Sequence, residues 1–198
     1  EMLRSLVGSE MCIRDSYYSL QPRLSARYDL GQGYSAKASY TCMAQYVHLL
    51  SSTPLSMPTD LWVPITKDIS PMYANQFSIG GYYSGLPGWE FSVEGYYKQM
   101  KHILEYQDGV SFFGTSTNWE EKVEMGEGRS FGLELMVQKT LGKTTGWLAY
   151  TLSKTDHRFK SGTINQGRWF PYKYDRRHSI SLNLSHKFSD RIDAGASW

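Results

Sequence analysis

The sequence predicts an all-β fold, an antiparallel transmembrane β-barrel present as a fragment of about eight strands of a larger barrel. Three observations predict this fold class. Short and long connections alternate along the chain, the segments between them alternate apolar with polar residues, and tyrosines gather near the segment ends. A soluble β-sandwich mixes its loop lengths and uses crossover connections, so this alternation weighs against one.

Eight strand-like segments follow one another between Leu20 and Trp198. Most are about 9–12 residues long, close to the length of a tilted strand that crosses a bilayer. The seven complete segments and the start of an eighth are Leu20–Tyr28, Tyr34–Tyr46, Tyr73–Tyr83, Trp89–Tyr106, Arg129–Thr140, Gly146–Thr155, Arg177–Phe188 and Ile192–Trp198.

The lengths of the connections indicate at which end of the predicted sheet each connection lies. Four are tight turns, Asp29–Gly33, Ser84–Gly88, Leu141–Thr145 and Ser189–Arg191. Three are long loops, Val47–Met72, Gln107–Gly128 and Asp156–Arg176. Because they alternate strictly, every turn lies at one end of the sheet and every loop at the other. In an outer-membrane barrel these ends are the periplasmic and the extracellular one.

Each segment has one apolar and one polar face. In Arg129–Thr140, Phe131, Leu133, Leu135 and Val137 alternate with polar residues that include Glu134 and Gln138. Successive side chains of a strand point to opposite faces, so we expect the apolar face to meet lipid and the polar face to line the lumen. The charges expected in the lumen are Arg23, Arg27, Lys37, Glu90, Glu94, Lys98 and Glu134.

The amino-acid composition limits the classes of function that the chain can have. The 198 residues suit one domain, and a net charge of +2 gives no sign of nucleic-acid binding. The 15 tyrosines and 6 tryptophans suit the aromatic girdles of a membrane barrel. No stretch approaches 18 apolar residues, so no transmembrane helix is expected. The histidines and the two cysteines show no metal-ligand spacing, and no nucleophile elbow is present. We therefore expect no enzyme activity, no metal and no cofactor.

The first 16 residues lack the alternating pattern of the rest. Their string SLVGSEMCIRDS resembles translated sequencing-adapter read-through, which indicates a non-native segment over 1–16 and a partial barrel domain over 17–198. The alternative is an ordinary loop or helix from further upstream in the barrel.

Aromatic residues in the long loops are the candidate ligand contacts. Trp62, Trp119 and Trp169 each offer a large flat face in a polar loop, which suits stacking on a sugar ring or a planar chelate. Packing of the loops on themselves is the alternative explanation.

Four stretches, at Pro22–Ser52, Met57–Pro71, Gly128–Phe159 and Lys173–Phe188, resemble TonB-dependent outer-membrane receptors of the Bacteroidota type, in the order found in the C-terminal half of the barrel. The element DRRH at Asp175–His178 is the most specific of these features. The resemblance implies a 22-stranded barrel with a plugged lumen. It also implies that the plug and the TonB-contacting segment lie outside this chain.

The resemblance implies an active transporter that binds a scarce ligand outside the cell. The ligand would be a siderophore, a cobalamin-like chelate, an oligosaccharide or a peptide, and the partners would be outer-membrane lipid and the TonB complex. A passive porin, an outer-membrane barrel enzyme and a soluble β-rich domain stay as alternatives.

Overall fold

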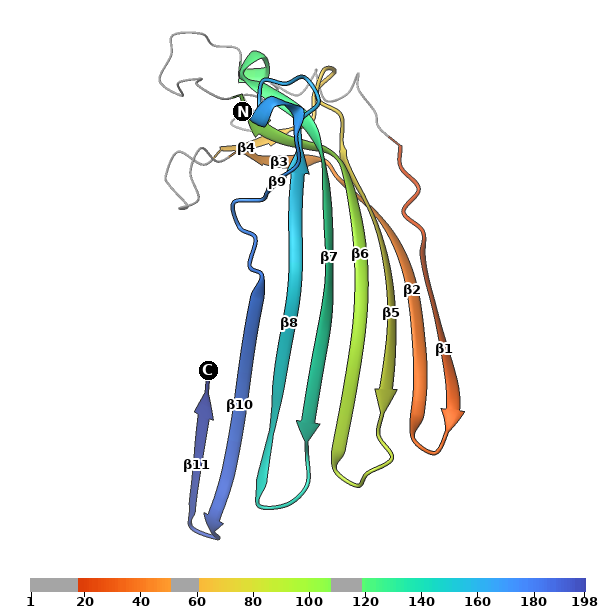
Figure 1. The fold of residues 1–198 in the computed structure, drawn as a ribbon, viewed down its shortest axis with the longest axis vertical. Coiled ribbons are helices and arrows are strands. Elements are labelled where there is room, and N and C mark those ends of the chain that lie inside the picture. The colour runs from red at the N-terminus through yellow and green to blue at the C-terminus, as the bar shows by residue number, and fades with distance from the viewer. Residues whose placement is uncertain (1–17, 51–60, 108–118) are drawn as a thin grey trace, which may run out of the picture.

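The computed structural model describes residues 18–50, 61–107 and 119–198, and its main feature is one open antiparallel sheet (Figure 1). Within these residues the strand order is β1-β2-β5-β6-β7-β8-β10-β11, so β1 and β11 are its edges and do not pair with each other. The strands are β1 (Arg23–Gly31), β2 (Tyr34–Gln45), β5 (Met72–Tyr83), β6 (Trp89–Tyr106), β7 (Val123–Lys139), β8 (Thr144–Arg158), β10 (His178–Ser189) and β11 (Ile192–Ser197).

The eight predicted segments are thus confirmed, with shifted ends. β7 begins at Val123, six residues before the predicted start, because β6 runs to Tyr106 and its last residue pairs with Val123. β8 extends to Arg158 and also pairs with the two-residue strand β9 (Phe170–Pro171). The prediction missed these extensions because charged residues interrupt the apolar alternation there.

The first long loop contains structure that the sequence analysis did not predict. β3 (Val47–Leu50) and β4 (Leu61–Pro64) form a separate antiparallel hairpin in it. The other long loops contain two short 3₁₀ turns, η1 (Trp119–Lys122) and η2 (Asn165–Gly167). No helix of the described residues is long and apolar enough to cross a bilayer.

The tight turns lie at the opposite end of the sheet from the long loops, β3, β4 and β9 (Figure 1). Between β1 and β2, Gly31 pairs with Tyr34 and leaves Gln32 and Gly33 as a two-residue loop, both with positive φ. Such a loop matches the twist of the strands it joins, and glycine adopts it without steric cost. The predicted separation of turns and loops is therefore confirmed.

The pairing register places the predicted apolar residues on one face. Leu135 of β7 lies opposite Val93 of β6 and Tyr150 of β8, and Glu134 lies opposite Glu94 and Thr151. Leu148 of β8 in turn lies opposite Leu182 of β10. Since cross-strand partners share a face, the apolar and polar sets each form a continuous surface across the sheet.

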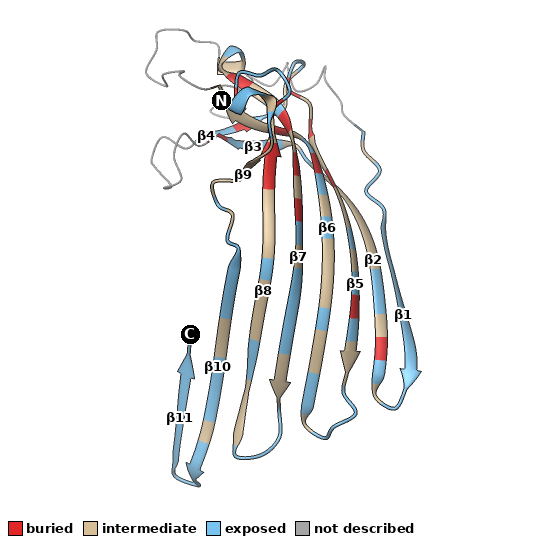
Figure 2. Cartoon of the chain, viewed as in Figure 1, coloured by how far each residue is buried: buried red, intermediate tan, exposed pale blue. Residues whose placement is uncertain are grey.

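The apolar surface is the more exposed of the two, which is the reverse of a water-soluble protein. Most buried residues lie toward the long-loop end of the strands (Figure 2). Ile79, Val93 and Leu133 are 69%, 49% and 41% exposed, whereas Ser130 on the polar face is 8% exposed. The buried apolar clusters lie instead at the long-loop end. An exposed apolar surface of this extent indicates contact with lipid or with another protein.

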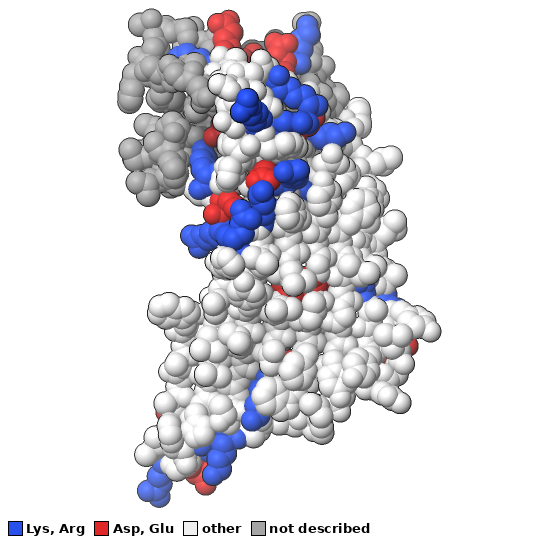
Figure 3. Space-filling view, in the orientation of Figure 1, with Lys and Arg blue, Asp and Glu red and all other residues white. Residues whose placement is uncertain are grey.

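Charge on the apolar surface is concentrated toward the two ends of the strands. Figure 3 shows few charged side chains across the middle of this face, with Lys, Arg, Asp and Glu gathered at the long-loop end and near the turns. A band of this kind between two polar zones is what a bilayer core requires of a transmembrane barrel.

Exchanging one residue on each face of β7 tests this arrangement. Leu135→Arg should lower the free energy of unfolding by about 2–4 kcal/mol because it places a charge in the lipid core. Met136→Arg, the next residue along, lies on the polar face and should have little effect. Urea titrations of the vesicle-inserted protein would measure both. Equal losses for the two variants would contradict the assignment of faces.

Candidate functional site

A hollow of about 430 Å³ lies on the polar face, close to the long loops. Its lining comes from β2, β3, β5, β6, β7, β8 and the last long loop, which are brought together at this end of the sheet. The lining residues include Lys98, Met100, Glu105, His157, Tyr172 and Lys173. In a barrel this position is the extracellular mouth of the lumen.

A β-bulge at His102 determines which side chains of β6 face the hollow. His102 has φ 58°, and the register shifts between Lys101 and Ile103. One extra residue reverses the direction of every later side chain. Glu105 therefore lies on the same face as Lys98, although the two residues are seven positions apart and would face opposite sides of a regular strand.

Glu105 forms an ion pair with Lys173 of the last long loop. The Nζ atom of Lys173 lies 3.1 Å from Oε1 of Glu105, and both side chains are largely buried, 19% and 24% exposed. This contact ties the loop to β6. Neither residue could be recognised as part of the site from the sequence, because a bulge leaves no clear signal in the alternation.

Lys98 lies deeper in the hollow, opposite Ser130 of β7. The structure shows no ion pair or hydrogen bond for its ammonium group within the described residues. Ser130 itself shares a hydrogen bond of 2.9 Å with Thr155. Lys98 is therefore a cation that a ligand or another part of the protein can reach.

Aromatic rings form one wall of the hollow. The ring of Tyr172 stacks on that of His157 with 4.2 Å between centroids, and Tyr174 packs edge-on against Tyr172. His157 is 7% exposed, and its Nδ1 atom has no hydrogen-bond partner among the described residues. Burial raises the pKa of the Tyr172 phenol, and the nearby Glu105 adds to this effect. The phenol is thus a neutral hydrogen-bonding group at pH 7.

The β3–β4 hairpin forms the opposite wall. Leu50 and Val63 are buried against Ile69 and Val123, so the hairpin packs on β7 and the segment before β5. His48 of the hairpin is 4% exposed, and its Nε2 atom lies 3.3 Å from the carbonyl oxygen of Ser70. Burial lowers the pKa of this histidine, with a smaller lowering from His102.

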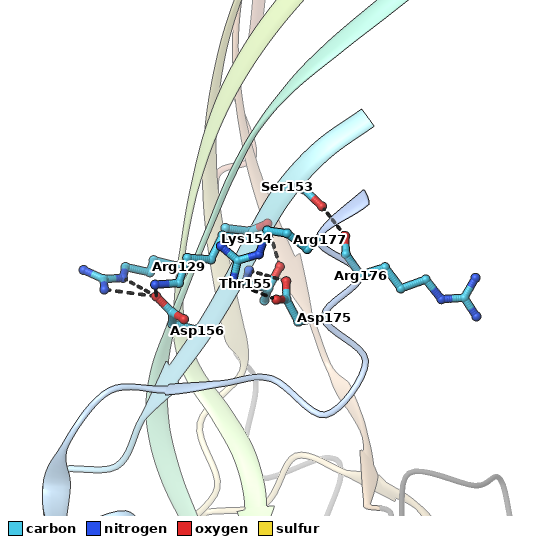
Figure 4. A network of polar contacts seen from close by, with 9 residues as sticks. Arg129, Ser153, Lys154, Thr155, Asp156, Asp175, Arg176 and Arg177 are labelled. Carbon is cyan, nitrogen blue, oxygen red and sulfur yellow. Dashed lines mark hydrogen bonds and ion pairs between the residues drawn. The ribbon is translucent and has the colours of Figure 1, made fainter. Parts of the chain in front are cut away.

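The element DRRH fastens the last long loop to β8 (Figure 4). Asp175 accepts a hydrogen bond of 2.7 Å from the backbone N–H of Thr155 and forms an ion pair with Arg177. The Ser153 hydroxyl donates to the carbonyl of Arg176, and the Ser153 N–H donates to that of Arg177. These bonds continue the β8–β10 ladder beyond its last pair, so the element has a structural role here.

The three predicted tryptophans do not converge on the hollow. Trp62 of β4 is 63% exposed and lies opposite Leu49, which lines the hollow. Trp119 packs against the buried cluster of Leu50, Val63, Ile69 and Val123. Of the three, Trp62 is the one whose cross-strand partner lines the hollow.

Trp169 lies between two guanidinium groups. The centre of its ring is 4.4 Å from Cζ of Arg129 and 4.7 Å from that of Arg158. By register Arg129 is on the apolar face, so this tryptophan belongs to the outer surface. Cation–π contacts and the preference of tryptophan for the membrane interface account for this position.

The site can bind and orient a ligand through stacking, hydrogen bonding and charge. Over the residues that the structure describes, no three His, Cys, Asp or Glu side chains lie close enough together to hold a metal ion. The fold and the site together define a class, a membrane β-barrel with a polar, water-facing interior and a hollow beneath its long loops.

Comparison with known families identifies the family. Residues 9–198 match the family described as TonB dependent receptor-like, beta-barrel, and the chain belongs to this family. The family is one of outer-membrane receptors. No curated protein and no solved structure matches the chain.

The buried histidine of the hairpin gives a pH-dependent prediction. Folding lowers the pKa of His48 from its ordinary value near 6.5. Near and below pH 6.5 the unfolded chain therefore binds more protons than the folded chain. The stability of the hairpin should fall as pH falls through that range. Amide hydrogen exchange of residues 47–50 at pH 7.5 and 5 would measure this. His48→Gln keeps a donor but cannot take up the proton, so a variant with an unchanged pH response would contradict the explanation.

Proposed function

We propose that this chain forms part of the barrel of an outer-membrane receptor that takes up a scarce ligand by TonB-dependent active transport. The observation that carries the proposal is the combination of an exposed apolar band with a polar inner face that ends in a hollow beneath the long loops. An external ligand arrives at this end, so the hollow and the exposed ring of Trp62 are the surfaces that meet it first.

The proposed ligand is a siderophore, a cobalamin-like chelate, an oligosaccharide or a peptide. Each has rings or amides that stack on tyrosine or tryptophan and accept hydrogen bonds. Lys98 supplies a cation for a carboxylate or hydroxamate oxygen, and His157 supplies a buried nitrogen that has no partner in the described structure. Trp119 and Trp169 are weaker candidates, because packing contacts hold both rings.

A plug domain that occupies the lumen and contacts the TonB complex is the proposed route of energy coupling. The polar face has charges that need such a partner. Arg27 lies opposite Lys37 and Glu94 opposite Glu134, and no ion pair within the described residues neutralises any of the four. Like charges directly opposite each other destabilise a sheet, so a segment with complementary charges would stabilise this face.

Two other proposals concern the extent and origin of the chain. The unpaired edges of β1 and β11 support a larger barrel, because backbone groups in lipid must all be paired. The resemblance suggests a 22-stranded barrel of a Bacteroidota-type receptor, with this chain in its C-terminal half. The non-native origin of residues 1–16 also stays a proposal. These residues lie outside the described part of the chain, and the family match begins within them, at residue 9.

The passive porin and the barrel enzyme are the alternatives, and one experiment separates them from the proposal. Uptake of a labelled ligand by cells that express the intact receptor should stop when the TonB complex is deleted. A porin would still admit the ligand, and an enzyme would convert it. Continued uptake without the TonB complex would overturn the proposal.

The residues of the hollow can be tested in the same cells. Lys98→Gln and Trp62→Ala should each weaken ligand binding to whole cells by about tenfold, equivalent to one lost charged or stacking contact of about 1.4 kcal/mol. Lys143→Gln, in a turn at the other end of the sheet, is the matched control and should bind as wild type does. Loss of binding in the control alone would mean that the two ends have been assigned the wrong way round.

A further inference from the structure

A second hollow, of about 630 Å³, lies on the apolar face of the sheet. It is lined mainly by side chains that face lipid in the proposed barrel: Phe77, Ile79, Tyr97, Phe131, Leu133 and Leu152. We call this hollow the apolar groove. It does not open into the lumen, so ligand uptake does not account for it.

The groove follows from two neighbouring cross-strand rows of residues. The row nearer the long loops runs Phe77–Tyr97–Phe131–Lys154, and the next runs Ile79–Gly95–Leu133–Leu152. Gly95 has no side chain, so a gap opens in the second row, beneath the three rings of the first. An ideal Cβ on Gly95 would meet nothing nearer than the carbonyl oxygen of Gly132, at 3.9 Å.

Cations close the groove at its long-loop end. Lys154 and Arg177 both line it, and their side chains are 33% and 46% exposed. Their carboxylate partners are much less accessible, with Asp156 at 3% and Asp175 at 9%. Arg129 shares Asp156 and is 36% exposed. The surface at this end therefore presents positive charge, because the carboxylates are nearly buried and the cationic side chains are not.

The geometry points to a specific site for a phosphate-bearing lipid, with an acyl chain in the apolar groove and the phosphate held by Lys154 and Arg177. Arginine binds phosphate oxygens through two parallel hydrogen bonds, and lysine adds a mobile point charge. Basic residues beside an apolar surface are a known arrangement for lipid headgroups. The long-loop end places the headgroup in the outer leaflet. This inference depends on the membrane-spanning placement in the proposed function and not on ligand uptake.

A partner protein fits the groove less well. The groove is mainly apolar and is charged only at its long-loop end, at Lys154 and Arg177, which matches an acyl chain that ends in a charged headgroup better than it matches a protein surface. A free anion would need the cations but not the groove. The two parts of the site can therefore be tested separately.

Native mass spectrometry of the intact receptor in detergent tests the site directly. Dioleoyl phosphatidic acid and dioleoyl phosphatidylcholine share their acyl chains and differ in the headgroup. The receptor should bind the first about tenfold more tightly, as expected for at least one additional charge-assisted contact. Lys154→Gln combined with Arg177→Gln should abolish this preference. Gly95→Val should fill the gap and weaken the binding of both lipids.

Matched controls exist for both parts of the site. Gly81 is on the same face, also has open space around its Cβ position and does not line the groove, so Gly81→Val should bind lipid as wild type does. Lys143→Gln removes a cation at the opposite end of the sheet and should leave the headgroup preference intact. Excess inorganic phosphate should not displace the lipid.

The outcomes separate the alternatives. Equal affinity for the two lipids in wild type, or full binding by Gly95→Val, would overturn the proposal, and displacement by inorganic phosphate would mean that a free anion occupies the site. If Gly95→Val fails to assemble, the Lys154 and Arg177 variant decides the question. If the receptor is not found in the outer membrane, the proposed function is wrong. The lipid-binding measurement uses purified receptor, so it tests the lipid site separately.

Discussion

Cross-strand hydrogen bonding is the constraint on which the rest of this structure depends. In a bilayer no water is available to the backbone, so each strand must pair along its length with a neighbour. Pairing fixes the register, and the register fixes which side chains share a face. The exposed apolar surface, the polar interior and the two hollows all follow from one set of pairings, from Arg23 opposite Thr41 to Asn183 opposite Ser197.

The candidate site shows how a local departure from that register shapes the hollow. The bulge at His102 turns Glu105 toward the polar face, where it holds Lys173 and with it the last long loop. The same loop brings Tyr172 against His157 and carries Asp175 to the backbone of Thr155. Loop residues thus become rigid parts of the wall of the hollow, because each is attached to a strand that the sheet already fixes in place.

Much of the fold could be predicted from the sequence, since strands with one lipid face and one water face must alternate in period two. The predicted ends of β7 and β8 were wrong by up to six residues because charged residues, among them Glu124, Glu127 and Asp156, interrupt the apolar pattern in the stretches that were missed. The candidate site was predicted less well. The loops could be recognised as the ligand-facing end, but the sequence does not show that Trp169 packs between two arginines, or that Glu105 and Lys173 meet across 68 residues. Such contacts depend on loop paths, which periodicity does not encode.

A scan of solvent and lipid access along β7 would show directly which face of the sheet meets lipid. Spin labels at single cysteines from residue 131 to residue 136, placed in the intact receptor after Cys12 and Cys42 are replaced by serine, would report collision rates with oxygen and with a water-soluble nickel complex. We expect high oxygen access at 131, 133 and 135 and high nickel access at 132, 134 and 136. An absence of alternation, or alternation in the opposite phase, would contradict the assignment of the apolar face to lipid and of the polar face to the water-filled interior.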